Sequence, residues 1–178
     1  MDNQQVTPFR VGWLIGFLEG EGCFSLGWVN TNTNNPSMRS MISMSSSDFE
    51  LCWKAGSILD DLGVGKLFVR VRHTNKKDQL EVAVIGLKRC KTLLDQIVPF
   101  MTDSRKKRAA ETLLEFINRR FSLPKTTPYT KEDVIFGERM RALNGYHLRQ
   151  NFRDLTRDTL GKSGEGKVQS NNESVGVN

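Results

Sequence analysis

Cysteine and histidine are scarce in this sequence, which has three cysteines and two histidines. The cysteines (Cys23, Cys52 and Cys90) form no Cys-x-x-Cys pair, and an odd, scattered set does not predict a disulfide framework. Two histidines are too few for a histidine-rich zinc nuclease or a Cys/His zinc finger. If a metal is used, its ligands should therefore be carboxylates and the metal a hard cation such as Mg²⁺.

Long hydrophobic runs are also absent. No run approaches the roughly 18–20 apolar residues that cross a bilayer, and residues 1–10 lack the basic-then-apolar order of a secretory signal. With 178 residues, 38% hydrophobic and 26% charged, the composition predicts a packed domain with no membrane partner. We expect an intracellular protein, and bacterial cytoplasm, mitochondrion and chloroplast all fit the sequence.

Positive charge is in excess and unevenly spread. The net charge is +6, from 26 basic and 20 acidic residues, and the excess lies in residues 61–160, whereas residues 1–60 are net negative. A basic region of this kind favours a polyanionic partner such as nucleic acid. The alternative is a basic α+β domain that binds an acidic protein, which would show no steep salt dependence with duplex DNA.

Hydrophobic periodicity predicts an α+β fold. Apolar residues recur at helical spacing in five segments and alternate in four others. The predicted helices are 8–21, 48–62, 87–98, 104–120 and 131–143, and the predicted strands are 23–30, 39–47, 66–73 and 79–85. The order predicts a four-stranded antiparallel sheet with helices on one face.

The other face of that sheet is predicted to be polar and basic. Alternation in the third strand turns Leu67, Val69 and Val71 inward and the residues between them outward. Such a face suits a DNA groove, where strand side chains reach base edges, although an ordinary solvated sheet face fits the pattern equally well. The predicted DNA-contacting residues are Ser25, Arg39, Ser43, Lys66, Phe68, Arg70, Arg72, Gln79 and Glu81.

The segment LIGFLEGEG (residues 14–22) is the most informative stretch. It places two carboxylates, Glu19 and Glu21, at the C-terminal end of an apolar helix. The helix dipole disfavours negative charge there, so a metal ion, a basic side chain or solvent should compensate. Taken alone, a solvated turn would explain this pattern.

The segment resembles the LAGLIDADG motif, which names a family of homing endonucleases. The predicted αββαββα order, the stretch LGVGKLFVRVR and the basic run Arg105–Arg108 after Pro99-Phe100 extend the resemblance over about residues 8–145. It implies an intron-encoded, Mg²⁺-dependent, site-specific double-strand DNA endonuclease in which Ca²⁺ supports binding without cleavage. A cleavage-deficient RNA maturase, with intron RNA as partner, or a DNA-binding regulator is the alternative.

The resemblance also assigns site residues. The second motif acid, Glu21, would bind the metal, with the backbone carbonyl of Gly20 as a further ligand. Lys106, or Lys107 after a one-residue shift, would stabilise charge in the active site. Well-known single-motif members carry a water-positioning glutamine at the end of the second strand, and here that place falls on Ser46 or Ser47.

Only one motif is present, and single-motif members form homodimers through their motif helices. The interface would then contain Trp13, Gly16, Phe17 and Gly20. Two such subunits would cut a long, near-palindromic duplex, one strand each. The expected domain organisation is an endonuclease domain at 1–145, a helical extension at 146–160 and a disordered tail at 161–178, which is rich in Gly, Ser and Asn.

Overall fold

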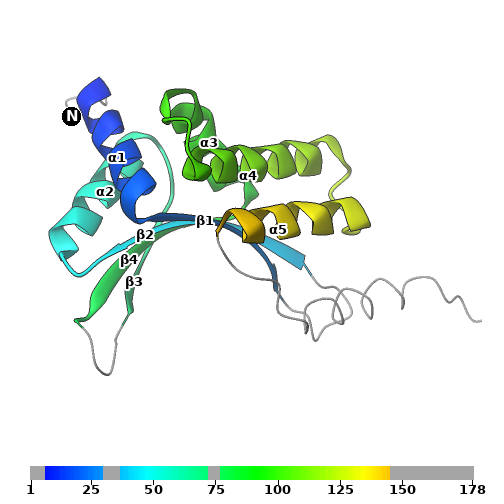
Figure 1. The fold of residues 1–178 in the computed structure, drawn as a ribbon, viewed down its shortest axis with the longest axis horizontal. Coiled ribbons are helices and arrows are strands. Elements are labelled where there is room, and N and C mark those ends of the chain that lie inside the picture. The colour runs from blue at the N-terminus through cyan, green and yellow to red at the C-terminus, as the bar shows by residue number, and fades with distance from the viewer. Residues whose placement is uncertain (1–6, 30–36, 72–76, 145–178) are drawn as a thin grey trace, which may run out of the picture. The chain divides into compact units, whose positions relative to one another are not determined.

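The computed structural model describes residues 7–29, 37–71 and 77–144 and has a mixed α+β architecture (Figure 1). The predicted C-terminal extension and tail lie outside these residues. The helices are α1 (Pro8–Glu21), α2 (Phe49–Asp61), α3 (Leu87–Ile97), α4 (Arg105–Ser122) and α5 (Lys131–Leu143), with a 3₁₀ turn η1 (Val98–Phe100). The strands are β1 (Gly22–Val29), β2 (Ser37–Ser46), β3 (Leu67–Val71) and β4 (Gln79–Ile85).

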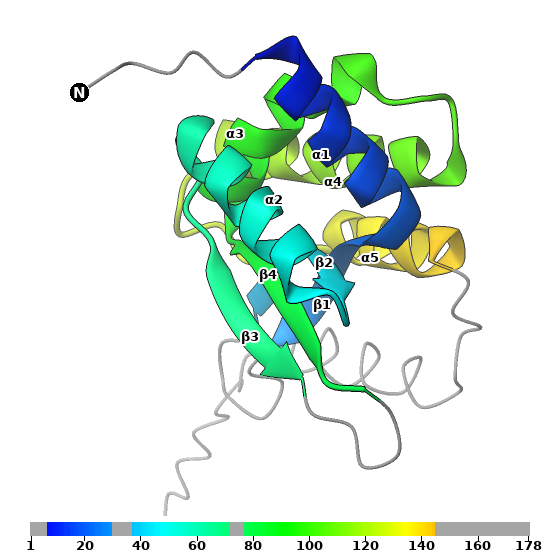
Figure 2. The same cartoon turned by 90° about the vertical axis from the view of Figure 1, so that its left-hand side faces the viewer.

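The four strands form one antiparallel sheet in the order β1-β2-β4-β3. The described helices all lie on one side of it, and no described helix or strand covers the other side (Figures 1 and 2). This confirms the predicted α+β class and the four-stranded antiparallel sheet. No helix in the described part of the chain is long and apolar enough to span a membrane.

The hydrophobic core fills the space between the sheet and the helices. Phe24, Ile42 and Val84 point toward the helices from neighbouring strands, and all three are fully buried. They meet apolar side chains of α1, α3 and α4, among them Leu14, Leu18, Leu93, Leu94, Leu113 and Phe116. Burial of these side chains supplies the main favourable free energy of folding.

Local capping explains where the helices begin. Pro8 occupies the first turn of α1, where its missing N–H costs nothing. Asp48 accepts a hydrogen bond from the Glu50 N–H at the start of α2, 3.1 Å. The side chain of Ser104 accepts one from the Lys107 N–H at the start of α4, 3.2 Å. These side chains satisfy amide groups that have no partner within the helix.

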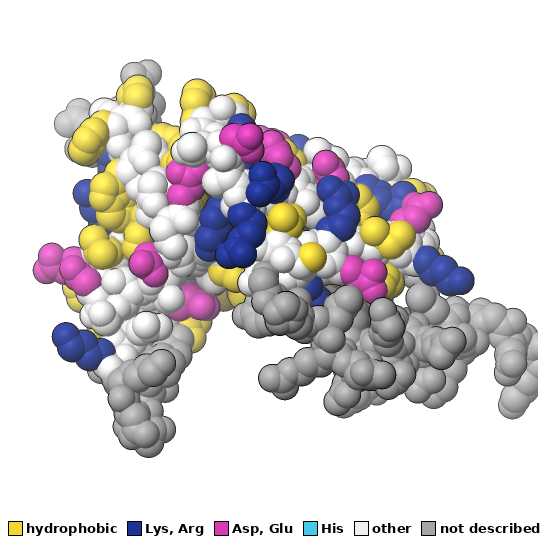
Figure 3. All heavy atoms as spheres, in the orientation of Figure 1, with side chains coloured by type: hydrophobic (Ala, Val, Ile, Leu, Met, Phe, Trp, Pro, Cys, Tyr) yellow, Lys and Arg dark blue, Asp and Glu magenta, His cyan; other side chains and the backbone are white. Residues whose placement is uncertain are grey.

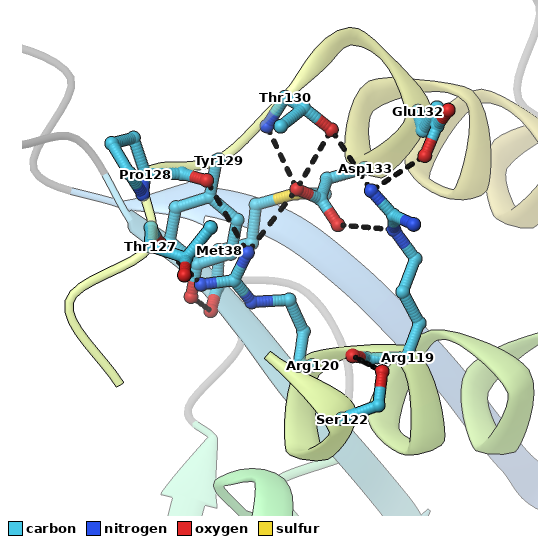
Figure 4. A network of polar contacts seen from close by, with 10 residues as sticks. All are labelled: Met38, Arg119, Arg120, Ser122, Thr127, Pro128, Tyr129, Thr130, Glu132 and Asp133. Carbon is cyan, nitrogen blue, oxygen red and sulfur yellow. Dashed lines mark hydrogen bonds and ion pairs between the residues drawn. The ribbon is translucent and has the colours of Figure 1, made fainter. Parts of the chain in front are cut away.

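Helix α5 is attached to α4 by a buried ionic network (Figure 4). The Asp133 carboxylate is fully buried and lies 3.3 Å from both the Arg119 Nε and the Arg120 Nη1. It also accepts a hydrogen bond from the Thr130 N–H, 2.7 Å. The Arg120 guanidinium stacks over the Tyr129 ring at 4.2 Å. The network therefore joins the two helices through a charge that is compensated on several sides.

Candidate active site and open sheet face

Helix α1 runs directly into strand β1 with no loop between them. The helix ends at Glu21, where the Gly22 N–H donates to the Leu18 carbonyl and the chain turns extended. A Cβ on Gly22 would come closer than 3.0 Å to the Leu18 backbone, so only glycine fits without a shift. The last residue of the motif thus allows the helix carrying the two carboxylates to end at the sheet.

The first motif carboxylate, Glu19, holds the segment that precedes α4. Its two oxygens accept hydrogen bonds from the Thr102 N–H, 2.8 Å, and the Thr102 hydroxyl, 3.1 Å. These bonds offset the unfavourable position of an acid at a helix C-terminus. Glu19 is therefore a structural link between α1 and the start of α4.

Lys106 forms a second link, on the other side of Glu21. Its ammonium group donates a hydrogen bond to the carbonyl of Gly22. At the neighbouring Lys107, the backbone N–H donates a hydrogen bond to the side chain of the N-cap residue Ser104. The contact with Gly22 therefore favours Lys106 over Lys107 as the lysine of the candidate site.

Glu21 lies between these two links in the chain and is exposed, as is Gly20. The carboxylate is thus held on a fixed backbone yet open to a ligand. Among the described residues, no group of three or more His, Cys, Asp or Glu side chains could hold a metal ion. A cation at Glu21 would therefore need oxygen ligands other than a cluster of described acidic side chains, since hard cations take about six or more.

Cys23 follows directly after the motif, and its thiol is influenced by the charges of Lys106 and Glu81. Burial raises the pKa of the Cys23 thiol, while the positive charge of Lys106 lowers it and the negative charge of Glu81 raises it. Lys106 and Glu81 are therefore each within electrostatic reach of the Cys23 thiol. This places Glu81, predicted only as a DNA contact, near the end of the motif.

Ser46 is used within its own turn. Its hydroxyl accepts a hydrogen bond from the Asp48 N–H, 3.0 Å, at the entry to α2. It pairs with Leu80 and so shares the helix-facing side of the sheet, whereas Ser45 pairs with Glu81 on the other side. Ser45 therefore faces the side on which Glu81 lies, and the predicted solvent-positioning serine does not.

The sheet side away from the helices, here called the open face, carries most of the predicted DNA-contacting residues. Ser25, Arg39, Ser43, Gln79 and Glu81 have open-face positions in the register. Arg39 is exposed, whereas Ser43 is buried between its neighbours. The open face is therefore a mixed polar and apolar surface.

Strand β3 has the opposite orientation from the prediction. Phe68 pairs with Val82 on the helix-facing side, and its ring lies against Gly56 of α2. Lys66, just before the strand, forms an ion pair with Asp60 of α2. The prediction that Lys66 and Phe68 face DNA is therefore wrong, because α2 provides both an apolar and an acidic partner for them.

The other predictions for β3 and its end concern two aliphatic residues and two arginines. Leu67 and Val69, predicted inward, pair with Ala83 and Glu81 on the open face and are about half exposed. Arg70 pairs with Leu80, which has a helix-facing position, and its side chain lies outside the described residues. Arg72 also lies outside them.

One side of α1 is open at its glycines in the part of the chain that the structure describes. A Cβ added to Gly12, Gly16 or Gly20 would meet nothing within 4 Å. Trp13 and Phe17 flank these glycines and are half-buried, with ring centroids 5.3 Å apart. The ammonium group of Lys54 lies 4.2 Å from the centroid of the Trp13 ring. The predicted interface residues therefore form one accessible strip along the motif helix.

Comparison with solved structures shows the same fold in proteins of low sequence identity. The homing endonuclease I-CvuI, in complex with DNA, has a TM-score of 0.68 and 20% identity, over 89% of this chain and 97% of that one. The archaeal intron-encoded homing endonuclease I-Vdi141I, complexed with DNA, has a TM-score of 0.64 and 19% identity, over 86% and 96%. The LAGLIDADG meganuclease I-AabMI, bound to uncleaved DNA, has a TM-score of 0.56 and 18% identity, over 80% and 47%. No protein-family model and no curated protein sequence matches the chain.

Proposed function

Since this chain has the LAGLIDADG homing-endonuclease fold, we propose that it is a site-specific endonuclease of double-stranded DNA. The observation that carries the proposal is the position of Glu21, an exposed carboxylate held between the Glu19–Thr102 and Lys106–Gly22 contacts. The same helix continues into a sheet whose open face no described helix or strand covers. DNA complexes of proteins with this fold support the assignment of duplex DNA as the substrate.

The proposed cofactor is Mg²⁺, with Glu21 and the Gly20 carbonyl as its ligands in this chain. Both groups offer oxygen, the donor that Mg²⁺ prefers, and both lie at an exposed helix end. When bound, the ion would lower the pKa of a water molecule and stabilise charge on the leaving oxygen. Ca²⁺, with similar ligand preference but looser geometry, should support binding without cleavage.

The residues of this chain would then act as follows. Glu21 would hold the cation at the end of α1. Lys106 would add positive charge beside the phosphate as that phosphate gains negative charge. In the reaction a water oxygen forms a bond to phosphorus, the bond from phosphorus to the 3′ oxygen breaks, and the water proton passes to solvent. The open face would contact base edges in the major groove on one side of the cut.

A homodimer would complete the site. At the end of α1 one chain supplies the exposed carboxylate of Glu21, and its described residues offer no three-ligand cluster. Packing two α1 helices along the glycine strip would bring two Glu21 side chains together, and bound cations and scissile phosphates would offset their repulsion. Such a dimer predicts a near-palindromic target with one cut on each strand.

Cleavage by Glu21→Gln tests the proposal. A randomised duplex library incubated with wild-type protein in Mg²⁺ should yield one enriched pseudo-palindrome that is cut. Glu21→Gln should bind that sequence in Ca²⁺ with little change but cut it at least 100-fold more slowly, because an amide is a weaker ligand than a carboxylate.

Glu19→Gln is the matched control, because it makes the same chemical change two residues away. Its amide oxygen can still accept from Thr102, so cleavage should fall less than tenfold and require the same Mg²⁺ concentration. An equal loss of cleavage rate in both variants, or a normal cleavage rate in Glu21→Gln, would show that Glu21 is not the metal ligand.

One observation favours a second function, that of a binding protein without nuclease activity. The serine at the predicted solvent-positioning place, Ser46, is engaged at the start of α2. A maturase or regulator would enrich the same sequence with wild type and Glu21→Gln and would leave no cut product with either. The selection described above separates the two functions.

A further inference from the structure

Two aliphatic side chains project from the β3 part of the open face. Leu67 is 50% exposed and Val69 is 46% exposed. In the register they lie beside Ala83 and Glu81 of β4, at the edge of the sheet. Exposed aliphatic pairs on a sheet face are costly in water, so a partner surface with apolar groups would stabilise them.

The orientation of β3 is fixed by contacts with α2 on the helix-facing side of the sheet. Phe68 packs against Gly56, and Lys66 pairs with Asp60, so α2 provides partners for both residues. A slip by one residue would break both contacts while moving Leu67 and Val69 to the other side. The outward position of the two aliphatic side chains is therefore part of the fold.

Charged groups that could read guanine are few on this face. Among the described side chains with open-face positions, only Arg39 and Glu81 are charged. Arg and Lys are the usual readers of guanine, whereas aliphatic groups contact the C5-methyl group of thymine. Gln79 lies opposite Val71 in the register, two residues along from Val69, and a glutamine side chain is suited to adenine.

We propose that Leu67 and Val69 are specificity-determining residues that contact thymine methyl groups, so that each half-site is A·T-rich where β3 enters the major groove. This inference rests on the proposed function, because it assumes that the open face contacts duplex DNA. The feature recognised would be the C5-methyl group, which distinguishes thymine from uracil.

Removal of that methyl group tests the inference directly. The full-length protein in Ca²⁺ is titrated with the duplex enriched from the randomised library, and then with duplexes in which single dT residues are replaced by dU. At one or two positions per half-site, wild type should bind about fourfold more weakly without the methyl group, which corresponds to about 0.8 kcal/mol for one carbon removed from water.

Leu67→Ala should bind the thymine duplex about fourfold more weakly and show no further loss with dU at the position that Leu67 contacts. Trp53→Ala is the matched control, because it truncates an exposed apolar side chain on α2, on the other side of the sheet. Its response to dU should equal that of wild type. Lys66→Gln should likewise leave the base preference unchanged.

The outcomes separate the two proposals. Binding of an enriched duplex with no response to dU at any position, or with the same response in Leu67→Ala, overturns this inference and leaves the endonuclease proposal intact. An enriched half-site without A·T pairs likewise overturns this inference and leaves the endonuclease proposal intact. Failure to retain any duplex overturns both proposals.

Discussion

Single residues at the end of α1 have separate tasks, which their chemistry alone does not reveal. Glu19 and Glu21 are the same residue type two positions apart, yet Glu19 accepts two hydrogen bonds from Thr102 while Glu21 is exposed. The sequence indicates that both acids need compensation at a helix C-terminus. It does not identify Thr102, because that partner is 83 residues away and belongs to a turn with no motif of its own.

The face of β3 is a second case in which sequence reasoning fails for a physical reason. The polar side chains of Lys66, Arg70 and Arg72 alternate with Leu67, Val69 and Val71 and so favour an inward position for the aliphatic residues, but the structure has the opposite orientation. The choice depends on Gly56, whose missing side chain makes room for the Phe68 ring. Where alternation is clear, as in Gln79–Ile85, the predicted strand and its faces are confirmed.

The buried thiol of Cys90 predicts a pH dependence of stability. Burial raises its pKa from its ordinary value of 9.0 to about 11. The folded protein therefore keeps a proton that the unfolded chain has lost, so this contribution is complete below pH 9 and is lost as pH rises toward 11. The slope should be about 1.4 kcal/mol per pH unit between these values.

Urea unfolding of wild type and Cys90→Ala at several pH values from 8 to 11 measures that slope by difference. Because lysines and tyrosines titrate in the same range in both proteins, their contribution cancels. Parallel stability curves for the two proteins would contradict the prediction.

At the scale of elements, helix ends are the best-predicted features. Pro8 and Asp48 begin their helices as predicted, and the helices 8–21 and 131–143 have the predicted bounds. Capping acts within a few residues, so local sequence contains the information. Contacts between elements, such as Lys106 with Gly22, depend on the packed fold and were found only through the resemblance and the structure.

The junction between α1 and β1 should not tolerate a side chain at Gly22. In Gly22→Ala the methyl group would meet the Leu18 backbone, so the helix end and Glu21 must move. We expect a loss of unfolding free energy of about 1–3 kcal/mol and a cleavage rate reduced at least tenfold. Thermal unfolding and a cleavage assay check the two effects.

Gly27→Ala serves as its control for stability, since Gly27 lies in the same strand and an added Cβ meets nothing within 4 Å. Its melting temperature should equal or exceed that of wild type, because alanine fits a strand better than glycine does. A Gly22→Ala protein as stable as Gly27→Ala would show that the junction can relax.

The attachment of α5 to α4 should depend on the charge of Asp133. In Asp133→Asn the buried guanidinium of Arg120, with a side chain only 7% exposed, loses its negatively charged partner. Breaking a buried ion pair by removing one member costs about 3–5 kcal/mol. The urea midpoint should therefore fall steeply.

The exposed pair of Arg139 and Glu115 joins the same two helices at 3.1 Å and provides a comparison. Glu115→Gln should cost less than about 1 kcal/mol, because both side chains are about half exposed. Similar losses in the two variants would mean that the Asp133 network contributes no more than a surface pair.

At the scale of the whole molecule, the proposal requires two chains. Gly16→Leu adds a large side chain to the strip of α1 at a position where a Cβ would meet nothing within 4 Å. It should shift sedimentation from dimer to monomer, reduce cleavage at least 100-fold and leave the fold intact by circular dichroism.

The control for this variant is Asn118→Leu, which introduces the same leucine side chain at an exposed position of α4. It should remain dimeric and active. A Gly16→Leu protein that sediments as a dimer and cleaves normally would place the interface elsewhere.

The uninterrupted passage from α1 into β1 has a consequence for how this protein could acquire a new target. The residue proposed to mark the cut, Glu21, and the strand proposed to contact bases follow each other in the chain without a spacer. The number of base pairs between the cut and the first contacted base is thus set by the backbone. A target lengthened by one base pair at that point should be refused even when every contacted base is retained. New specificity would then arise from exchanged side chains along the strands, with the spacing inherited unchanged.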